Sequence, residues 1–173
     1  TLRSGRLFAN DSTYAVVNGA LRAGVPGHNA LLVLGFDVYA QPAARTAAVL
    51  RTLGFPDAPV RTGTFDGRPV WIVGGGAGPT PDGRSAQWWV DQERLVFVRL
   101  VQPWPGDTSK AFDARFLDYR PLAGGWIAPR VEAYVDGRRT LLEEYRDVRA
   151  NVTLDPILFD PRRWTEGRHW ARR

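Results

Sequence analysis

The sequence predicts an α+β fold: a curved antiparallel β-sheet, an unclosed half-barrel, with two or so helices covering one face. One observation is the series of short apolar and aromatic runs between Ser85 and Asn151, each closed by a turn. Another is the alanine-rich segment from Gln41 to Gly54, which has the composition of a helix. Because short strands joined by tight turns pair with their chain neighbours, the series predicts an antiparallel meander.

The segment 95–101 is predicted to be the central strand of this meander. It carries apolar side chains on both strand parities: Leu95, Phe97 and Val101 on one, Val96, Val98 and Leu100 on the other. A strand that is apolar on both faces is covered on both faces. Turns are expected where Asp, Gly and Pro supply the necessary backbone angles, at residues 91–93, 103–107, 123–125 and 136–137.

The upstream segments are assigned in chain order. Asp11, Ser12 and Thr13 offer capping oxygens, so residues 14–22 are expected to form a short helix that stops at Gly24. Residues 30–39 form an apolar run with β-branched and aromatic side chains and are expected to be a buried strand. Residues 41–53 have Pro42 at the start and Gly54 after the end, which predicts a helix.

A hairpin is predicted around Asp66-Gly67, because this dipeptide favours a two-residue turn between the runs 60–63 and 68–74. The glycine-rich residues 74–83 follow. They lack the Gly-Lys-Ser/Thr ending of a phosphate-binding loop and contain two prolines, so a flexible hairpin loop is the better interpretation.

Composition and charge set the class of protein. The chain has 173 residues, 44% hydrophobic and 24% charged, which is typical of one globular domain. We expect a single domain over residues 1–161 and a basic C-terminal tail over residues 162–173. The tail holds five arginines against Glu166, so it supplies most of the net charge of +5 and the rest of the chain is nearly neutral. Binding to nucleic acid is therefore disfavoured.

The first residue and the residue usage predict a processed protein. The sequence begins with Thr1 and contains neither Met nor Cys, so a signal segment or a lipid-bearing N-terminal cysteine is expected to have been removed. No apolar run approaches the roughly 20 residues of a membrane span. Lys110 is the single lysine among 23 basic residues, which indicates coding bias in a GC-rich genome.

A search for catalytic chemistry is largely negative. The two histidines, His28 in a turn and His169 in the tail, are expected to be solvated rather than metal ligands. No serine lies in a Gly-x-Ser-x-Gly elbow, and thiol catalysis needs a cysteine. We therefore predict no enzyme activity, no cofactor and no metal. An enzyme would have to draw on Asp91, Arg99, Asp118 and Tyr119, which are better explained as turn residues or surface ion pairs.

Aromatic side chains recur in nearly every predicted strand or its turn. They fit two interpretations: a filled core between helices and sheet, or the lining of an apolar cavity for a lipid or acyl chain. The candidate ligand-binding residues are Trp71, Trp89, Phe97, Phe116, Trp126 and Tyr134.

The order of motifs resembles a known family. The segments that carry the likeness are Asp66 to Gly74, Trp88-Trp89-Val90-Asp91, Leu95 to Arg99, Phe116-Leu117-Asp118-Tyr119, Ile127-Ala128-Pro129, Tyr145 to Asn151 and the closing residues to Pro161. Over about residues 61–161 the chain resembles the LolA-like family of bacterial outer-membrane lipoprotein-sorting and lipoprotein carrier proteins. The likeness rests on pattern and order, and the N-terminal part of the chain does not match it.

The resemblance implies a half-barrel whose hollow face binds acyl chains or other lipids under a helical lid, in the periplasm or anchored to the cell envelope. It implies a hydrophobic ligand, an envelope protein as a partner, and peripheral or lipid-anchored contact with the membrane without a span. The alternative is a non-enzymatic structural or protein-interaction module of the bacterial envelope with a filled core.

Overall fold

The computed structural model describes residues 3–55, 57–78 and 80–168. The chain divides into two compact units, described separately below: Thr1–Val33 with Asn151–Arg173 (unit 1), and Leu34–Ala150 (unit 2). A large antiparallel sheet that does not close and two α-helices confirm the predicted α+β class. The single domain expected over residues 1–161 stays a prediction.

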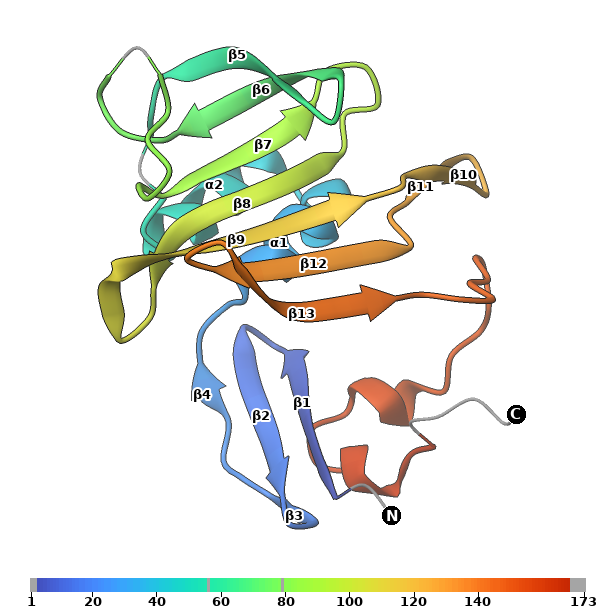
Figure 1. Cartoon of the computed structure of the whole chain (residues 1–173). Helices are drawn as coiled ribbons and strands as arrows, with labels where there is room; N and C mark the ends of the chain where they lie inside the picture. The colour runs from blue at the N-terminus through green and yellow to red at the C-terminus, as the bar shows by residue number, and fades with distance from the viewer. Residues whose placement is uncertain (1–2, 56, 79, 169–173) are drawn as a thin grey trace. The chain divides into compact units, whose positions relative to one another are not determined.

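Unit 2 is built on a seven-stranded antiparallel sheet in the order β13-β12-β9-β8-β7-β6-β5 (Figure 1). The strands are β5 (Val60–Phe65), β6 (Arg68–Gly74), β7 (Gln87–Asp91), β8 (Phe97–Trp104), β9 (Asp107–Leu117), β12 (Arg130–Val135) and β13 (Arg138–Glu144). The meander and the central place of β8 are confirmed. The short hairpin of β10 (Arg120–Leu122) and β11 (Gly125–Ile127) is inserted between β9 and β12.

One face of this sheet carries the helical residues of unit 2 (Figure 1). They are the end of α1 (Ala30–Gly35), the 3₁₀ turn η1 (Asp37–Tyr39) and α2 (Ala43–Thr52). The prediction of a helix over 41–53 is confirmed, with Pro42 as its N-cap residue and Gly54 in the left-handed region after its end. Leu50 of α2 is buried.

The register of the ladders assigns side chains to the two faces, because directly opposed residues on antiparallel strands point the same way. Trp88 pairs with Leu100 and Leu100 with Ala114, on the face that carries the helices, called here the helix face. Trp89 pairs with Arg99 and Arg99 with Arg115, on the opposite, outer face. A bulge in β8 makes this possible, because Val90 pairs with Phe97 while Trp89 pairs with Arg99.

The helix predicted over residues 14–22 is wrong. These residues form strands β2 (Ser12–Val17) and β3 (Ala20–Leu21), which pair with each other and, through β2, with β1 (Ser4–Ala9) and β4 (Val25–Pro26). Asn10, Asp11 and Asn18 have positive φ and build the two tight turns. The oxygens interpreted as a helix cap therefore belong to hairpin turns, and Asn18-Gly19 is a stronger signal than the cap.

The buried strand predicted over residues 30–39 is also wrong, since these residues form α1 and η1. The Asn29 side chain begins α1 by accepting the backbone N–H of Leu31 at 2.9 Å. Asn is a favourable N-cap residue, and the Ala and Leu residues that follow have high helix propensity. A local cap therefore outweighs the preference of an apolar run for a strand.

Unit 1 has its own small core, in which Leu7, Val16 and Trp164 are buried together. Trp164 begins the 3₁₀ turn η3 (Trp164–Glu166), which follows η2 (Pro156–Phe159). Of the predicted basic tail, the structure describes residues 162–168, and this part includes the buried Trp164. His169 lies outside the described residues.

Candidate functional site: an apolar cavity in unit 2

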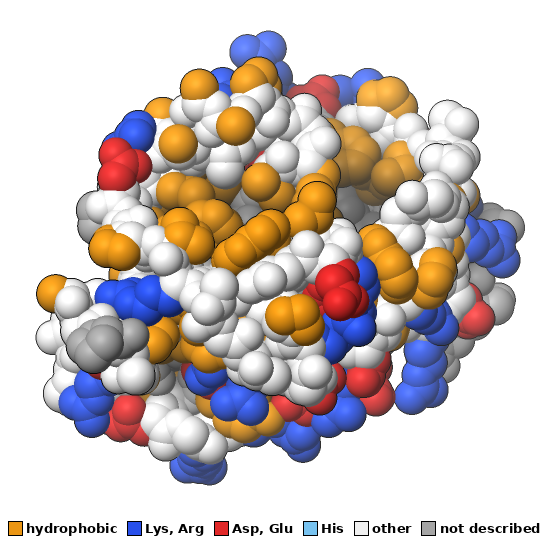
Figure 2. Space-filling view, turned by 90° about the horizontal axis from the view of Figure 1, so that it is seen from above, with side chains coloured by type: hydrophobic (Ala, Val, Ile, Leu, Met, Phe, Trp, Pro, Cys, Tyr) orange, Lys and Arg blue, Asp and Glu red, His pale blue; other side chains and the backbone are white. Residues whose placement is uncertain are grey.

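Unit 2 contains an apolar cavity of about 690 Å³ on the helix face. Five segments enclose it: the end of α1 with η1, the β7–β8 turn, β9 with β12, the β10–β11 hairpin, and the chain after β13. Hydrophobic side chains are also visible in a hollow on the face drawn in Figure 2. The lining residues are Gly35, Phe36, Tyr39, Arg94, Leu95, Val96, Phe116, Tyr119, Gly125, Trp126, Ile127, Ala128, Val131, Tyr145 and Val148.

The β7–β8 turn is held in place by Asp91, whose side chain is almost fully buried. Its carboxylate accepts the backbone N–H groups of Glu93 at 3.0 Å and Arg94 at 2.8 Å, and Nε of Arg68 lies at 2.6 Å. Burial by itself would raise the pKa of Asp91. The Arg68 guanidinium and the two backbone donors outweigh that effect and hold the pKa below its ordinary value. Asp91 is therefore an ionised anchor for the turn.

Leu95 is the unusual residue of this turn. Its φ is +55°, a left-handed conformation that costs a branched apolar residue roughly 1 kcal/mol or more. Its side chain lines the cavity and is nevertheless 58% exposed. An exposed leucine in a strained conformation gains little from packing within the chain. The turn therefore presents Leu95 to the cavity at a cost in stability, which is typical of a residue kept for binding.

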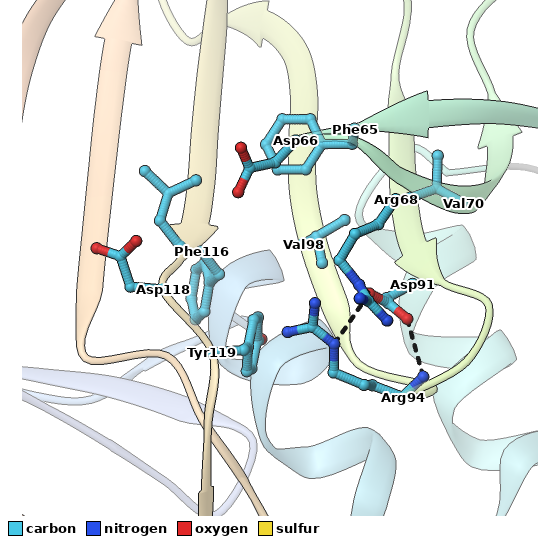
Figure 3. A pocket seen from close by; sticks show the side chains of 11 residues that line it. Phe65, Asp66, Arg68, Val70, Asp91, Arg94, Val98, Phe116, Asp118 and Tyr119 are labelled. Carbon is cyan, nitrogen blue, oxygen red and sulfur yellow. Dashed lines mark hydrogen bonds and ion pairs between the residues drawn. The ribbon is translucent and has the colours of Figure 1, made fainter.

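Arg94 precedes Leu95 and lies in the wall of the cavity. Its guanidinium carbon is 5.9 Å from the centre of the Tyr119 ring and 5.3 Å from the Trp126 ring, and its Nε is 3.2 Å from the Asp91 carboxylate. The close-up in Figure 3 shows the Arg94 side chain between Tyr119 and Asp91. Only 17% of the side chain is exposed. The cavity thus has a cation fixed in its otherwise apolar wall.

Two tyrosines attach the surrounding segments to the backbone of the same residue of β8, Phe97. The hydroxyl of Tyr39, from η1, accepts the backbone N–H of Phe97 at 2.9 Å, and the hydroxyl of Tyr119 donates to the Phe97 carbonyl. Burial raises the pKa of both phenols, so both stay neutral at physiological pH. These bonds satisfy the polar groups of a buried backbone position and fix both rings against the cavity.

A smaller pocket of about 260 Å³ lies beside the cavity and shares Arg94, Phe116 and Tyr119 with it (Figure 3). Asp91, Asp118 and Tyr119, three of the residues considered for an enzyme, also line this pocket. The fourth, Arg99, pairs with Asp113 on the outer face at 2.9 Å. Among the described residues there is no cluster of His, Asp and Glu that could hold a metal ion.

A further hollow of about 890 Å³ lies between the end of α2 and the glycine-rich loop. Its wall includes Phe55, Trp88 and Pro103. The carbonyls of Gly74, Gly76 and Gly78 all accept hydrogen bonds from the Arg61 guanidinium, which holds the loop in one conformation. The glycine-rich loop is therefore fixed by a cation instead of offering its own N–H groups to a phosphate.

The six predicted ligand-binding residues separate into four groups. Phe116 and Trp126 line the apolar cavity. Phe97 is buried beneath it, with its ring centre 5.0 Å from that of Phe116, and is part of the core. Trp71 belongs to the helix face by register but is 38% exposed and does not line the cavity.

Trp89 and Tyr134 point to the outer face instead. The guanidinium of Arg99 lies 4.5 Å from the Trp89 ring, and that of Arg115 lies 4.5 Å from the Tyr134 ring. Asp113 pairs with both arginines, at 2.9 Å and 2.7 Å. These aromatic residues therefore belong to a cross-strand network of ion pairs and cation–π contacts that covers the outer face.

Sequence reasoning missed several lining residues, above all Arg94, Leu95, Tyr39 and Tyr145. Leu95 was assigned to the central strand, whereas β8 begins at Phe97. A usable signal was present, since the Asp91-Gln92-Glu93 turn places the following Arg94 and Leu95 in the connection between two strands, where binding residues often occur.

No family model, curated protein or solved structure matches the chain. None of the helices among the described residues is long and apolar enough to cross a membrane. The LolA-like resemblance therefore stays an interpretation of the sequence.

Proposed function

We propose that the chain is a cell-envelope binding protein that holds a hydrophobic ligand, such as a lipid or an acyl chain, in the apolar cavity of unit 2. Periplasmic or lipid-anchored placement belongs to the same proposal and rests on the sequence resemblance. The observation that carries it is Leu95, an exposed apolar side chain held at positive φ and facing a cavity of about 690 Å³.

The size and lining of the cavity support this function. Small-molecule sites in proteins commonly measure about 300–1,000 Å³ and have mostly apolar walls with a few polar groups. Phe36, Trp126 and Ile127 supply such a wall, and the tyrosine hydroxyls beside them are occupied by the backbone of Phe97. Each methylene group transferred from water into such a site contributes about 0.8 kcal/mol, so no covalent step is needed for tight binding.

The alternative, a protein-interaction module, has one observation in its favour. β13 is an edge strand of the sheet, and its Leu141 and Leu142 are both exposed. An edge strand with unpaired backbone groups and apolar side chains can pair with a strand of another protein.

The proposal is tested first by native mass spectrometry of gently purified protein, followed by organic extraction and identification of the extracted lipid. Phe36→Asp should abolish ligand retention, because it places a charge in the cavity wall. Phe159→Asp is the matched control: the two phenylalanines are 55% and 56% exposed, but Phe159 lies in unit 1 and does not line the cavity.

Retention by the wild type and the Phe159→Asp variant, with loss in Phe36→Asp, would support the carrier function. Circular dichroism should show that both variants keep the fold. A wild-type mass equal to that of the bare chain, with no binding to fatty acids, phospholipids or lipopeptides, would refute it and favour the interaction module.

A further inference from the structure

The apolar cavity contains one charge, and this charge constrains the ligand. Among the described residues that line it, Arg94 is the only one with a charged side chain. The carboxylate paired with Arg94 lines the neighbouring pocket: this is Asp91, and Glu93, which precedes Arg94 in the chain, is exposed. A ligand in the apolar cavity therefore meets a cation and no lining anion.

The orientation of the guanidinium leaves donors for a ligand. Arg94 contacts Asp91 through Nε, and the rings of Tyr119 and Trp126 lie within cation–π distance. Among the described residues, its terminal Nη1 and Nη2 groups make no hydrogen bond. The end of a guanidinium presents two parallel N–H donors, which match the two oxygens of a carboxylate or phosphate.

The Asp91 carboxylate does not cancel this cation. It is shared with Arg68, whose Nε is closer, at 2.6 Å against 3.2 Å for Arg94, and it also accepts two backbone N–H groups. Only 17% of the Arg94 side chain is exposed, so water screens its charge less than that of a surface arginine. A second anion at its free end would compensate this partly shielded cation.

We propose that the ligand of this cavity is a single-chain amphiphile with an anionic head, a carboxylate or a phosphate, whose head binds the terminal nitrogens of Arg94 while its chain fills the apolar wall. This inference rests on the proposed function and makes it more specific. Leu95, next in sequence to Arg94, would contact the part of the alkyl chain nearest the head. The β7–β8 turn would therefore bind both the head and the beginning of the alkyl chain.

The test uses four ligands whose main chains have the same number of carbons and different heads: palmitate, hexadecyl phosphate, hexadecanol and hexadecyltrimethylammonium. Each competes with a neutral fluorescent lipid probe at concentrations below micelle formation. Because hydrogen bonds between charged groups are stronger than those of a neutral hydroxyl, both anions should bind wild type at least about tenfold more tightly than hexadecanol. The cationic ligand should bind more weakly than hexadecanol, and the two anions compared with each other identify the preferred head.

Arg94→Gln should remove the preference for anions, so that palmitate, hexadecyl phosphate and hexadecanol bind the variant with similar affinity. Arg94→Lys, which keeps the charge without the paired donors, should retain part of the preference. Arg120→Gln is the control, since Arg120 is exposed on β10 and does not line the cavity. The comparison of the four ligands on wild type tests the anionic head without any variant. The proposal therefore stays testable even if Arg94→Gln does not fold.

Equal affinity of wild type for palmitate, hexadecyl phosphate and hexadecanol would overturn the anionic head while the hydrophobic cavity stands. A preference for anions that survives in Arg94→Gln would also overturn it. Failure of all four ligands to displace the probe, together with failure of the probe to bind, would refute the proposed function and this inference with it.

Discussion

Leu95 combines a strained backbone conformation with a side chain that lines the cavity. A residue with φ of +55° would ordinarily be Gly or Asn, because these tolerate the left-handed region. Leu in its place costs folding free energy and returns little of it through burial, since the side chain is 58% exposed. Under the proposed function, a contact with the ligand would explain why leucine occupies this turn.

Leu95→Asn is expected to raise the free energy of unfolding by up to about 1 kcal/mol, because Asn adopts positive φ more readily. It should weaken binding of an apolar ligand by about 1 kcal/mol, roughly fivefold in Kd, because an apolar contact is lost. Urea unfolding and ligand titration measure the two effects. Leu142→Asn on β13 serves as control: it should lower stability slightly, because Asn is unfavourable in strands, and leave binding unchanged. A fall in stability for Leu95→Asn would contradict the account.

Glu132 makes the stability of unit 2 depend on pH. Its carboxylate is buried on the outer face, and the Tyr134 hydroxyl, then Arg130, hold its pKa at about 2, below the ordinary 4.5. A lowered carboxyl pKa stabilises the fold above the unfolded-state pKa, and this contribution is lost as pH falls from about 4.5 to about 2. Asp91 and Asp113, whose pKa values are also lowered, act in the same direction.

Glu132→Gln should therefore destabilise the protein at neutral pH by about 1.5–3 kcal/mol, the range for hydrogen bonds to a charged group. The difference between variant and wild type should shrink as the pH falls toward 2, because the wild-type carboxylate becomes protonated. Chemical unfolding at a series of pH values measures it. A constant difference at all pH values would show that the charge of Glu132 is not the cause.

Among the structural elements, η1 is attached to the sheet at the wall of the cavity. Tyr39 joins η1 to the backbone of β8 through its hydroxyl, and Phe36 beside it lines the same cavity. Tyr39→Phe leaves the buried N–H of Phe97 without this acceptor, which costs about 1–3 kcal/mol. We expect faster hydrogen exchange at Phe97 and faster ligand release, with most of the ring packing retained. Unchanged exchange at Phe97 would mean that the bond does not hold η1 in place.

The same elements show what the sequence could predict. Turn residues predicted the meander correctly, because Asp-Gly and Gly-Gly positions require particular backbone angles whatever the distant contacts. Two upstream segments were wrong, since Asn18-Gly19 and the Asn29 cap are local signals that an apolar pattern concealed. The cavity was predicted only through Phe116 and Trp126. The prediction that Trp89 lines the cavity was wrong, because the β8 bulge moves its partner Arg99 to the outer face. No residue pattern in the sequence predicts this bulge.

At the scale of the whole molecule, each compact unit has a buried hydrophobic cluster of its own. Leu7, Val16 and Trp164 form that of unit 1, whereas Val70, Ile72, Val96 and Val98 form one of those in unit 2. All residues lining the apolar cavity belong to unit 2. Stability of unit 1 and ligand binding should therefore respond separately to substitution.

Trp164→Ala tests this separation. Removing a buried Trp side chain costs about 3–5 kcal/mol, enough to unfold a small unit whose core contains few large residues. Hydrogen exchange should become fast in residues 3–28 and 151–168, while α1, which contains the boundary between the two units, and residues 36–150 keep their protection and the chain keeps its ligand affinity. Phe159→Asp, an exposed position in the same unit, should leave exchange unchanged and serves as control. Loss of protection throughout residues 34–150, or loss of ligand affinity, would show that the two units fold and function as one, and the cavity would then depend on contacts outside unit 2.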